Sequence, residues 1–275
     1  MTRVAVNGIE LNVEESGDGP ALVLLHGFTG DMTTWDPFLN LWPGYTKVCF
    51  DIIGHGKSDS PADPTRYTMD HAVNDILDVL DEMQIGSFLL LGYSMGGRLA
   101  LHIAMTEPDR VWALMLASAS PGIEDEGERA ARARSDNAIA DEIERNGLEA
   151  FVDKWQSQPL FASQAKLLPD VRDRQRAQRL QNNPVGLANS LRGMGAGNQE
   201  YLMPYAGALG MPVLLLAGAL DEKYSAEMRK MAWSLPTSVL QTVPGAGHAI
   251  HLERPDVFSG FVKRFLDVCQ PPPPD

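Results

Sequence analysis

Cysteine is almost absent from this chain of 275 residues, which contains only Cys49 and Cys269. The two lie far apart and form no Cys-x-x-Cys pair, so the sequence offers neither a disulfide framework nor a redox motif. No spacing of His, Cys and carboxylates indicates a metal site, and the glycine-rich stretches lack the Gly-x-x-x-x-Gly-Lys of a phosphate loop. We therefore expect no metal, no cofactor and a reducing, cytoplasmic location.

Positive charge and long hydrophobic runs are also scarce. The 23 Lys and Arg residues face 36 Asp and Glu residues, and the net charge of −13 argues against nucleic acid or an anionic membrane as a partner. The longest apolar run, residues 211–220, is too short to span a bilayer, and residues 1–8 lack the apolar core of a signal peptide. We expect a soluble monomer or small homo-oligomer that acts on a small molecule.

The most informative stretch, residues 89–100, reads LLLGYSMGGRLA. An apolar run suited to a buried strand breaks into Gly-x-Ser-x-Gly and resumes with a helical pattern, which is the context of a nucleophile elbow. Gly92 and Gly96 would let strand and helix approach closely, while Ser94 would occupy a strained turn that costs about 1–3 kcal/mol. An ordinary tight turn is the alternative, and the flanking strand and helix favour a catalytic serine.

Strand-like and helix-like segments alternate along most of the chain. A hairpin is expected around Asn7-Gly8, and a helix through Trp35, Phe38 and Leu41. Further strands are expected at 21–25, 48–52, 88–91, 111–117, 213–218 and 239–243, with helices near 69–83, 95–107 and 257–268. This alternation predicts an α/β protein with a doubly wound, mostly parallel sheet.

Residues 121–197 depart from this alternation, because they contain no strand-like run and carry many arginines. A helical insertion between two strands of such a sheet lies over the carboxyl ends of the strands, where α/β proteins bind ligands. We therefore expect a core formed by residues 1–120 and 198–270, a helical cap at 121–197, and a flexible proline-rich tail at 271–275.

Two further residues complete a candidate triad with Ser94. Asp221 and His248 each follow an expected parallel strand, and the order Ser…Asp…His is that of α/β-hydrolases. Asp221 could instead cap a helix, with Glu222 as the competing carboxylate, and His251 competes with His248. The backbone N–H groups of Phe28 and Met95 are the expected oxyanion donors, whereas the histidine at position 26 is expected to make structural hydrogen bonds.

These residues look like the α/β-hydrolase superfamily, and within it they most resemble the MenH group. The resemblance rests on LHGFTG (25–30), GYSMGGR (92–98), SASPG (118–122), RARSD (132–136), FVDKWQSQPLFA (151–162), RLQNNP (179–184), DEK (221–223) and AGH (246–248). It implies an α/β-hydrolase fold with a helical cap. It also implies a lyase of menaquinone biosynthesis that eliminates pyruvate from 2-succinyl-5-enolpyruvyl-6-hydroxy-3-cyclohexene-1-carboxylate, using Ser–His–Asp for proton abstraction.

The same resemblance implies that Arg98, Arg132 and Arg179 bind substrate carboxylates and that Tyr93 and Trp155 line the pocket. Arginine suits carboxylates because its planar fork can bind them through two hydrogen bonds. The alternatives are solvated or ion-paired arginines and aromatic residues that only fill the core. Two other functions stay open: a serine carboxylesterase or carbon–carbon bond hydrolase with the same triad, and a binding protein without catalysis.

Overall fold

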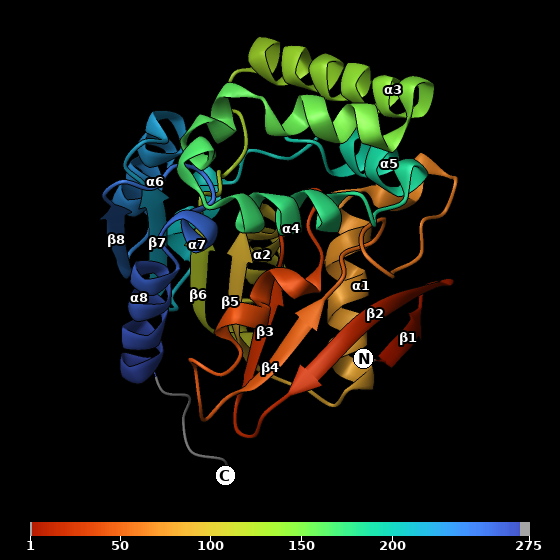
Figure 1. Ribbon diagram of the computed structural model, residues 1–275. Helices are drawn as coiled ribbons and strands as arrows, with labels where there is room; N and C mark the ends of the chain where they lie inside the picture. Colours follow the sequence, from red (N-terminus) through yellow and green to blue (C-terminus); the bar gives the residue numbers. More distant parts are fainter. Residues whose placement is uncertain (1, 270–275) are drawn as a thin grey trace.

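The computed structural model describes residues 2–269, which form a central sheet with helices on both faces and a layer of helices across one end (Figure 1). The expected tail at 271–275 lies outside the described residues. The sheet has the order β1-β2-β4-β3-β5-β6-β7-β8, in which β1 and β2 pair antiparallel and β3 to β8 run parallel. Its strands are β1 (Thr2–Val6), β2 (Ile9–Ser16), β3 (Ala21–Leu25), β4 (Thr46–Phe50), β5 (Phe88–Tyr93), β6 (Val111–Ala117), β7 (Val213–Gly218) and β8 (Ser238–Val243).

The helices expected near 69–83, 95–107 and 257–268 are present in the structure as α1, α2 and α8. The α-helices are α1 (Met69–Glu82), α2 (Met95–Thr106), α3 (Glu126–Gln156), α4 (Pro169–Arg179), α5 (Pro184–Met194), α6 (Glu222–Ser234), α7 (Ile250–Glu253) and α8 (Pro255–Val268). Short 3-10 helices are η1 (Met32–Phe38), η2 (Pro64–Tyr67), η3 (Pro108–Arg110), η4 (Pro159–Lys166) and η5 (Met203–Ala208).

Two expected elements differ from the structure. The segment through Trp35 is a 3-10 helix that ends at Phe38, because Pro37 inside it lacks an N–H donor, and Leu41 lies outside it and is half exposed. The strand expected at 48–52 is β4, which ends two residues earlier. There the backbone leaves the sheet at Asp51, whose carboxylate accepts a hydrogen bond from the Met32 N–H.

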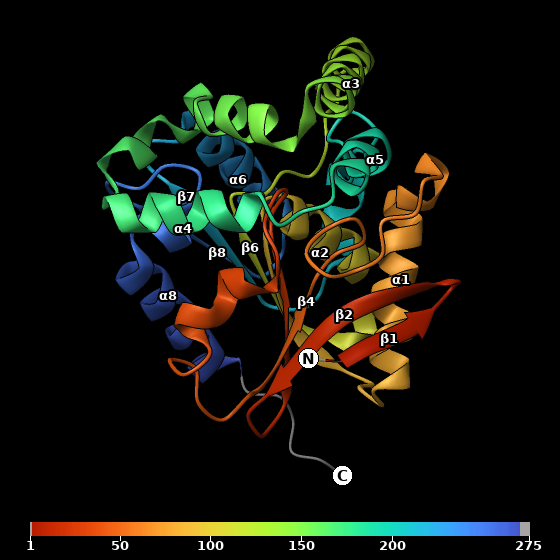
Figure 2. The same cartoon turned by 45° about the vertical axis from the view of Figure 1, so that its right-hand side comes forward.

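Two hydrophobic cores fix the sheet between its helices, on opposite faces (Figure 2). On one face α1, α2 and α6 pack against alternate strand residues such as Val23 and Leu90. On the other face Trp35 and Phe38 of η1 pack with Phe258 of α8. Burial on both faces explains why β3, β5, β6 and β7 are nearly uninterrupted apolar runs.

Helices from the segment expected as a cap lie across the carboxyl ends of the parallel strands (Figures 1 and 2). Helix α3 packs along α5, and together they enclose a small apolar core that includes Ile143, Phe151 and Leu187. Helix α3 bends at Gly147, whose φ of 80° interrupts the helical geometry. The cap helices therefore have their own packing and roof the end of the sheet where the candidate residues lie.

The passage from β5 to α2 depends on two glycines that have no room for a side chain. A Cβ at Gly92 would lie 2.2 Å from the Gly96 carbonyl oxygen, and one at Gly96 would lie 2.4 Å from the carbonyl oxygens of Leu25 and His26. These contacts bring helix α2 directly against β3 and β5. The expected elbow is confirmed as a close backbone contact between strand and helix.

Replacing Gly92 by Ala should therefore destabilise the protein by about 1–3 kcal/mol or more, because backbone atoms rather than flexible side chains oppose the new methyl group. Gly86→Ala is the matched control, since that position is exposed and a Cβ there meets nothing within 4 Å. Urea unfolding of both variants measures the difference. Equal stability of the Gly92 and Gly86 variants would contradict the close approach.

Candidate active site

Ser94 lies at the end of β5 and caps the N-terminus of α2, in a backbone conformation that is rare for a residue with a side chain. Its φ is 53° and its ψ is −109°, a geometry that costs about 1–3 kcal/mol and persists only where the surroundings impose it. The packing of Gly92 and Gly96 supplies that constraint. The strained turn presents the hydroxyl above the sheet edge.

The three triad candidates meet in one hydrogen-bonded chain. The Ser94 hydroxyl donates to His248 Nε2 across 2.9 Å, and His248 Nδ1–H donates to Asp221 Oδ2 across 2.7 Å. The Asp221 side chain also accepts from the Tyr224 N–H, so it caps α6 and holds the imidazole at once. The competing Glu222 is exposed at the surface.

His251, the alternative base, is directed elsewhere. Its ring packs against Tyr93 with centroids 4.4 Å apart, and burial lowers its pKa to about 3. The histidine at position 26 makes the structural bonds expected of it, because its Nδ1–H donates to the Gly27 carbonyl while Nε2 accepts from the Ile52 N–H. The geometry therefore singles out His248 as the base next to Ser94.

The two expected oxyanion donors flank the serine. Phe28 follows Gly27, where a Cβ would lie 3.4 Å from Ser94 Cβ, and Phe28 lines the same cavity as the serine. Met95 is the first residue of α2, where N–H groups lack helical partners. Within residues 2–269 neither N–H donates a hydrogen bond to the protein. Both are available to a negatively charged oxygen.

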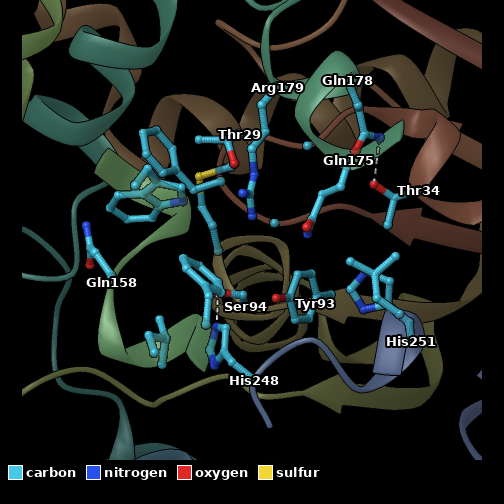
Figure 3. A pocket seen from close by; sticks show the side chains of 18 of the residues that line it. Thr29, Thr34, Tyr93, Ser94, Gln158, Gln175, Gln178, Arg179, His248 and His251 are labelled. Atoms are coloured by element: carbon cyan, nitrogen blue, oxygen red, sulfur yellow. Dashed lines mark hydrogen bonds between the residues drawn. The ribbon is translucent and has the colours of Figure 1, made fainter. Parts of the chain in front are cut away.

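A cavity of about 790 Å³ opens above Ser94, between the sheet edge and the cap (Figure 3). Its size suits a small molecule. All five residues expected to bind substrate line it: Tyr93, Arg98, Arg132, Trp155 and Arg179. In Figure 3 Arg179 extends from α4 toward Ser94 and Tyr93. The arrangement thus brings a nucleophile, a base and the three expected arginines to one chamber.

Two of these arginines are buried and have no acidic partner among the residues described. Arg98 is 8% exposed and donates to the amide oxygen of Gln199 across 3.0 Å. Arg179 is 4% exposed, lies 5.2 Å from the Phe161 ring centre, and leaves its Nη1 without a partner. Burial lowers the pKa of each guanidinium to about 10, and the Asp136 carboxylate opposes this shift at Arg98 without forming an ion pair with it.

The third, Arg132, differs because its Nε donates to Asp136 Oδ1 across 2.8 Å and its side chain is 35% exposed. The cap arginines outside the cavity wall point to solvent or pair on the surface, as Arg192 does with Asp141 and Glu144. Surface pairs also hold Arg129 and Arg176, while Arg134, Arg145 and Arg172 are at least partly exposed. Arg174 does line the cavity, but its side chain is 70% exposed and pairs with Asp170. Arg98 and Arg179 therefore stand apart from the solvated arginines of the cap.

The aromatic candidates form part of the cavity wall. Trp155 packs edge-on against Phe28 with ring centres 5.2 Å apart, and its Nε1–H is buried without an acceptor in the described part of the chain. Burial raises the pKa of the Tyr93 phenol, so it stays protonated and can donate a hydrogen bond. One wall residue was not expected: Tyr224, whose ring centre lies 4.5 Å from that of His248. No local motif marks it, since it reads as an ordinary residue of α6.

A second unexpected residue, Glu253, holds the loop that carries His248. Its carboxylate accepts from the Gly247 N–H across 2.7 Å and from the Ala249 N–H across 3.3 Å, one on each side of the histidine. The spacing His-x-x-x-x-Glu at the start of a short helix was the available signal. Glu253 thus fixes the backbone from which the imidazole reaches Ser94.

This site can deprotonate a substrate or attack it. Ser94 can lose its proton to His248, and the N–H groups of Phe28 and Met95 can stabilise an oxyanion.

Among residues 2–269 no cluster of three or more His, Cys, Asp or Glu side chains could hold a metal ion. None of the helices there is long and apolar enough to cross a membrane.

Residues 20–255 match the model of the alpha/beta hydrolase fold family. A putative 2-succinyl-6-hydroxy-2,4-cyclohexadiene-1-carboxylate synthase of Bacillus subtilis is 43% identical over 94% of this chain and 96% of its own length. The synthase of that name from Photorhabdus laumondii is 32% identical over 91% of this chain and 87% of its own.

A solved structure of MenH from S. aureus is also similar, with a TM-score of 0.90 and 34% identity over 94% of this chain and 99% of that one. The expected fold, a mostly parallel sheet with the order found in the structure, is confirmed by both kinds of comparison. The chain therefore belongs to the alpha/beta hydrolase family and, within it, groups with the 2-succinyl-6-hydroxy-2,4-cyclohexadiene-1-carboxylate synthases.

Proposed function

We propose that this protein is a lyase of menaquinone biosynthesis. It would convert 2-succinyl-5-enolpyruvyl-6-hydroxy-3-cyclohexene-1-carboxylate to 2-succinyl-6-hydroxy-2,4-cyclohexadiene-1-carboxylate and pyruvate, the reaction implied by its relatives' names. The observation that carries the proposal is the pair of buried guanidinium groups without acidic partners in the described chain, Arg98 and Arg179, in the cavity that holds Ser94. A buried charge is costly unless it is paired, so these cations favour an anionic ligand.

The bond changes follow from the two names. A ring with one double bond, at carbon 3, becomes a ring with double bonds at carbons 2 and 4, so a proton leaves carbon 2 and the enolpyruvyl oxygen leaves carbon 5. Carbon 2 carries the succinyl ketone, and its proton is acidic because the resulting carbanion is an enolate. The released enolpyruvate takes up a proton and becomes pyruvate. One proton moves and one carbon–oxygen bond breaks, so no cofactor is required.

The triad would supply the base. His248 Nε2 accepts the proton of Ser94, and the serine oxygen removes the proton from carbon 2. Asp221 keeps the imidazole in the tautomer that presents a bare Nε2 to the serine, and it stabilises the imidazolium that forms. Serine acts here as a base and forms no covalent bond to the substrate.

The enolate oxygen would lie between the N–H groups of Phe28 and Met95. Donors that are already oriented toward a developing charge are worth about 3–4 kcal/mol each in barrier height. The same donors favour the enolate over the neutral ketone, so they lower the barrier to proton loss at carbon 2. Their freedom from acceptors within residues 2–269 supports this role.

The arginines would bind the carboxylates. The substrate carries one carboxylate on the ring, one on the succinyl chain and one on the enolpyruvyl group, and the cavity wall offers Arg98, Arg132 and Arg179. A charged hydrogen bond of this kind is worth about 1.5–3 kcal/mol. The net charge of −13 makes such a local positive site necessary, because the molecule as a whole repels a polyanion.

The alternative of ester or carbon–carbon bond hydrolysis uses the same triad through an acyl-enzyme, but it has no need for three cations. A cytoplasmic location belongs to the proposal, and it is supported by the free thiols of Cys49 and Cys269. The absence of nucleic acid and membrane partners and a monomeric or small homo-oligomeric state also stay part of the proposal.

Replacing Ser94 by Ala should lower the rate of pyruvate release from the cyclohexene substrate by about 10²–10⁴-fold, because the positioned base is lost. Ser157→Ala, at the exposed end of α3, is the control and should keep full activity. The same preparations are assayed with p-nitrophenyl acetate for a burst of acyl-enzyme. Undiminished pyruvate release by the Ser94 variant, or a burst on the ester without any pyruvate release by the unsubstituted protein, would contradict the mechanism.

Replacing Arg179 by Met should raise KM about 10–100-fold, since the loss of a charged hydrogen bond costs about 1.5–3 kcal/mol. Arg172→Met is the control on the same helix, because Arg172 is exposed and lies outside the cavity wall. Steady-state kinetics of pyruvate release measures both. A KM equal in the two variants would remove Arg179 from the binding site.

Replacing Glu253 by Gln should lower kcat about tenfold with little change in KM. The amide can accept from only one of the two N–H groups, and its own NH₂ opposes the other, so the His248 loop loses a contact worth about 1 kcal/mol or more. Labelling of Ser94 by a fluorophosphonate should slow in parallel. Asp256→Asn removes an exposed carboxylate nearby and is the control; a Glu253 variant that labels at the control rate would show that the loop needs no such support.

A further inference from the structure

A carboxylate lies in the wall of the cavity that the proposed function reserves for anions. Asp136 of α3 is fully buried and lines the same chamber as Arg98, Arg132 and Arg179. An acidic group at this place repels a polyanionic substrate, and its burial costs desolvation energy. A buried carboxylate at this place is expected only if it makes a contribution larger than the repulsion and the desolvation cost together.

Asp136 is only half satisfied within the described part of the chain. Oδ1 accepts from Arg132 Nε across 2.8 Å, whereas Oδ2 is buried and accepts no hydrogen bond. Gly195 covers this oxygen on one side, because a Cβ there would lie 2.7 Å from Oδ2. A carboxylate that served stability alone would use both oxygens, as surface Asp153 does with Arg176 Nε and Nη2.

The contact at Nε matters for what Arg132 presents to the cavity. A guanidinium has two edges that can hold a carboxylate through two hydrogen bonds, one made by Nε and an Nη and the other by the two Nη atoms. Asp136 occupies the first edge at Nε, and no hydrogen bond to either Nη is found among residues 2–269. The second edge is therefore the one left for a ligand.

Arg132 needs this support more than the other two arginines. Arg98 and Arg179 are enclosed, one bonded to Gln199 and the other over the ring of Phe161. Arg132 is 35% exposed, so its long side chain could otherwise turn to water and keep its rotamer freedom. Asp136 stands one helical turn away on the same face of α3, the spacing at which side chains meet.

We propose that Asp136 is a positioning residue for substrate binding: it fixes the guanidinium of Arg132 so that its two Nη atoms face the cavity as a preformed fork for one carboxylate. The proposal rests on the proposed function for the identity of the anion. It assigns to Asp136 no contact with the reacting atoms. The fork is built before substrate arrives, which lowers the ordering cost of binding.

The proposal and simple electrostatics predict opposite changes in anion affinity when Asp136 is replaced. Replacing Asp136 by Asn removes a negative charge from the cavity, so electrostatics alone predicts tighter anion binding. If Asp136 positions Arg132, the same substitution frees the guanidinium and weakens binding. Whether the substitution weakens or strengthens anion binding therefore separates the two interpretations. A residue with a purely structural role would leave the affinity for the anion unchanged.

The experiment measures KM for pyruvate release and, by calorimetry, the Kd of 2-succinylbenzoate, an aromatic dicarboxylate that carries the ring carboxylate and succinyl chain but cannot eliminate pyruvate. For Asp136→Asn we expect both constants to rise about tenfold with kcat nearly unchanged, the loss of one bidentate contact. Asp153→Asn, which removes a carboxylate from the surface of the same helix, is the control and should change neither.

A double substitution supplies the second test and addresses folding. Arg132→Met leaves a buried carboxylate without a partner, so this variant is compared with a double variant that carries both Arg132→Met and Asp136→Asn. Both charges are gone from the double variant, and its thermal stability should recover. Once Arg132 has been replaced, removal of Asp136 should no longer weaken binding, because nothing remains for it to position.

Three outcomes overturn the proposal: a Kd for Asp136→Asn that is unchanged or lower, an equal loss when the same substitution is made in the Arg132→Met variant, or no binding of 2-succinylbenzoate by the unsubstituted protein at millimolar concentration. Failure of the lyase function is a separate result. It appears as absent pyruvate release by the unsubstituted protein, while the calorimetric comparison still reports on Asp136.

Discussion

The close contact between β5 and α2 is the constraint on which the rest of the site depends. Gly92 and Gly96 allow two backbone segments to touch, and the turn between them forces Ser94 to a positive φ. That strain of about 1–3 kcal/mol is carried by the packing of the two hydrophobic cores. The same turn starts α2 at Met95, so nucleophile and oxyanion donor come from one feature. Looser packing here would misplace both.

A second constraint is electrostatic. An acidic protein gathers a few cations into a chamber and keeps most of them from its own carboxylates. Arg98 and Arg179 are held by an amide and an aromatic ring, which orient a guanidinium without neutralising it. Most other cap arginines pair at the surface, where an ion pair contributes little to stability. Because their partners are neutral, Arg98 and Arg179 keep their positive charge available to a ligand in the cavity.

The sequence predicted the elements that local chemistry determines. Gly-x-Ser-x-Gly between a strand and a helix located Ser94, and residues directly after parallel strands located Asp221 and His248, because the carboxyl ends of such strands share one edge. It could not separate inward from outward arginines in the cap, since that distinction depends on how α3, α4 and α5 pack. Glu253 was missed for a related reason. The His-x-x-x-x-Glu spacing alone does not reveal its role, which depends on how its carboxylate meets two backbone N–H groups.

The division between core and cap also explains how one triad can serve different reactions. The chain Ser94–His248–Asp221 and the free N–H groups will stabilise any oxyanion next to the serine, whether it arises by attack on a carbonyl or by loss of a proton beside one. What distinguishes the two is where the substrate is held. Under the proposed function, Arg98 of α2 and the cap arginines would hold a polycarboxylate with carbon 2 near the serine oxygen, in a position that favours proton removal over attack. The type of reaction would then be set by where charge is placed around the cavity, while the elbow supplies a base suited to either course.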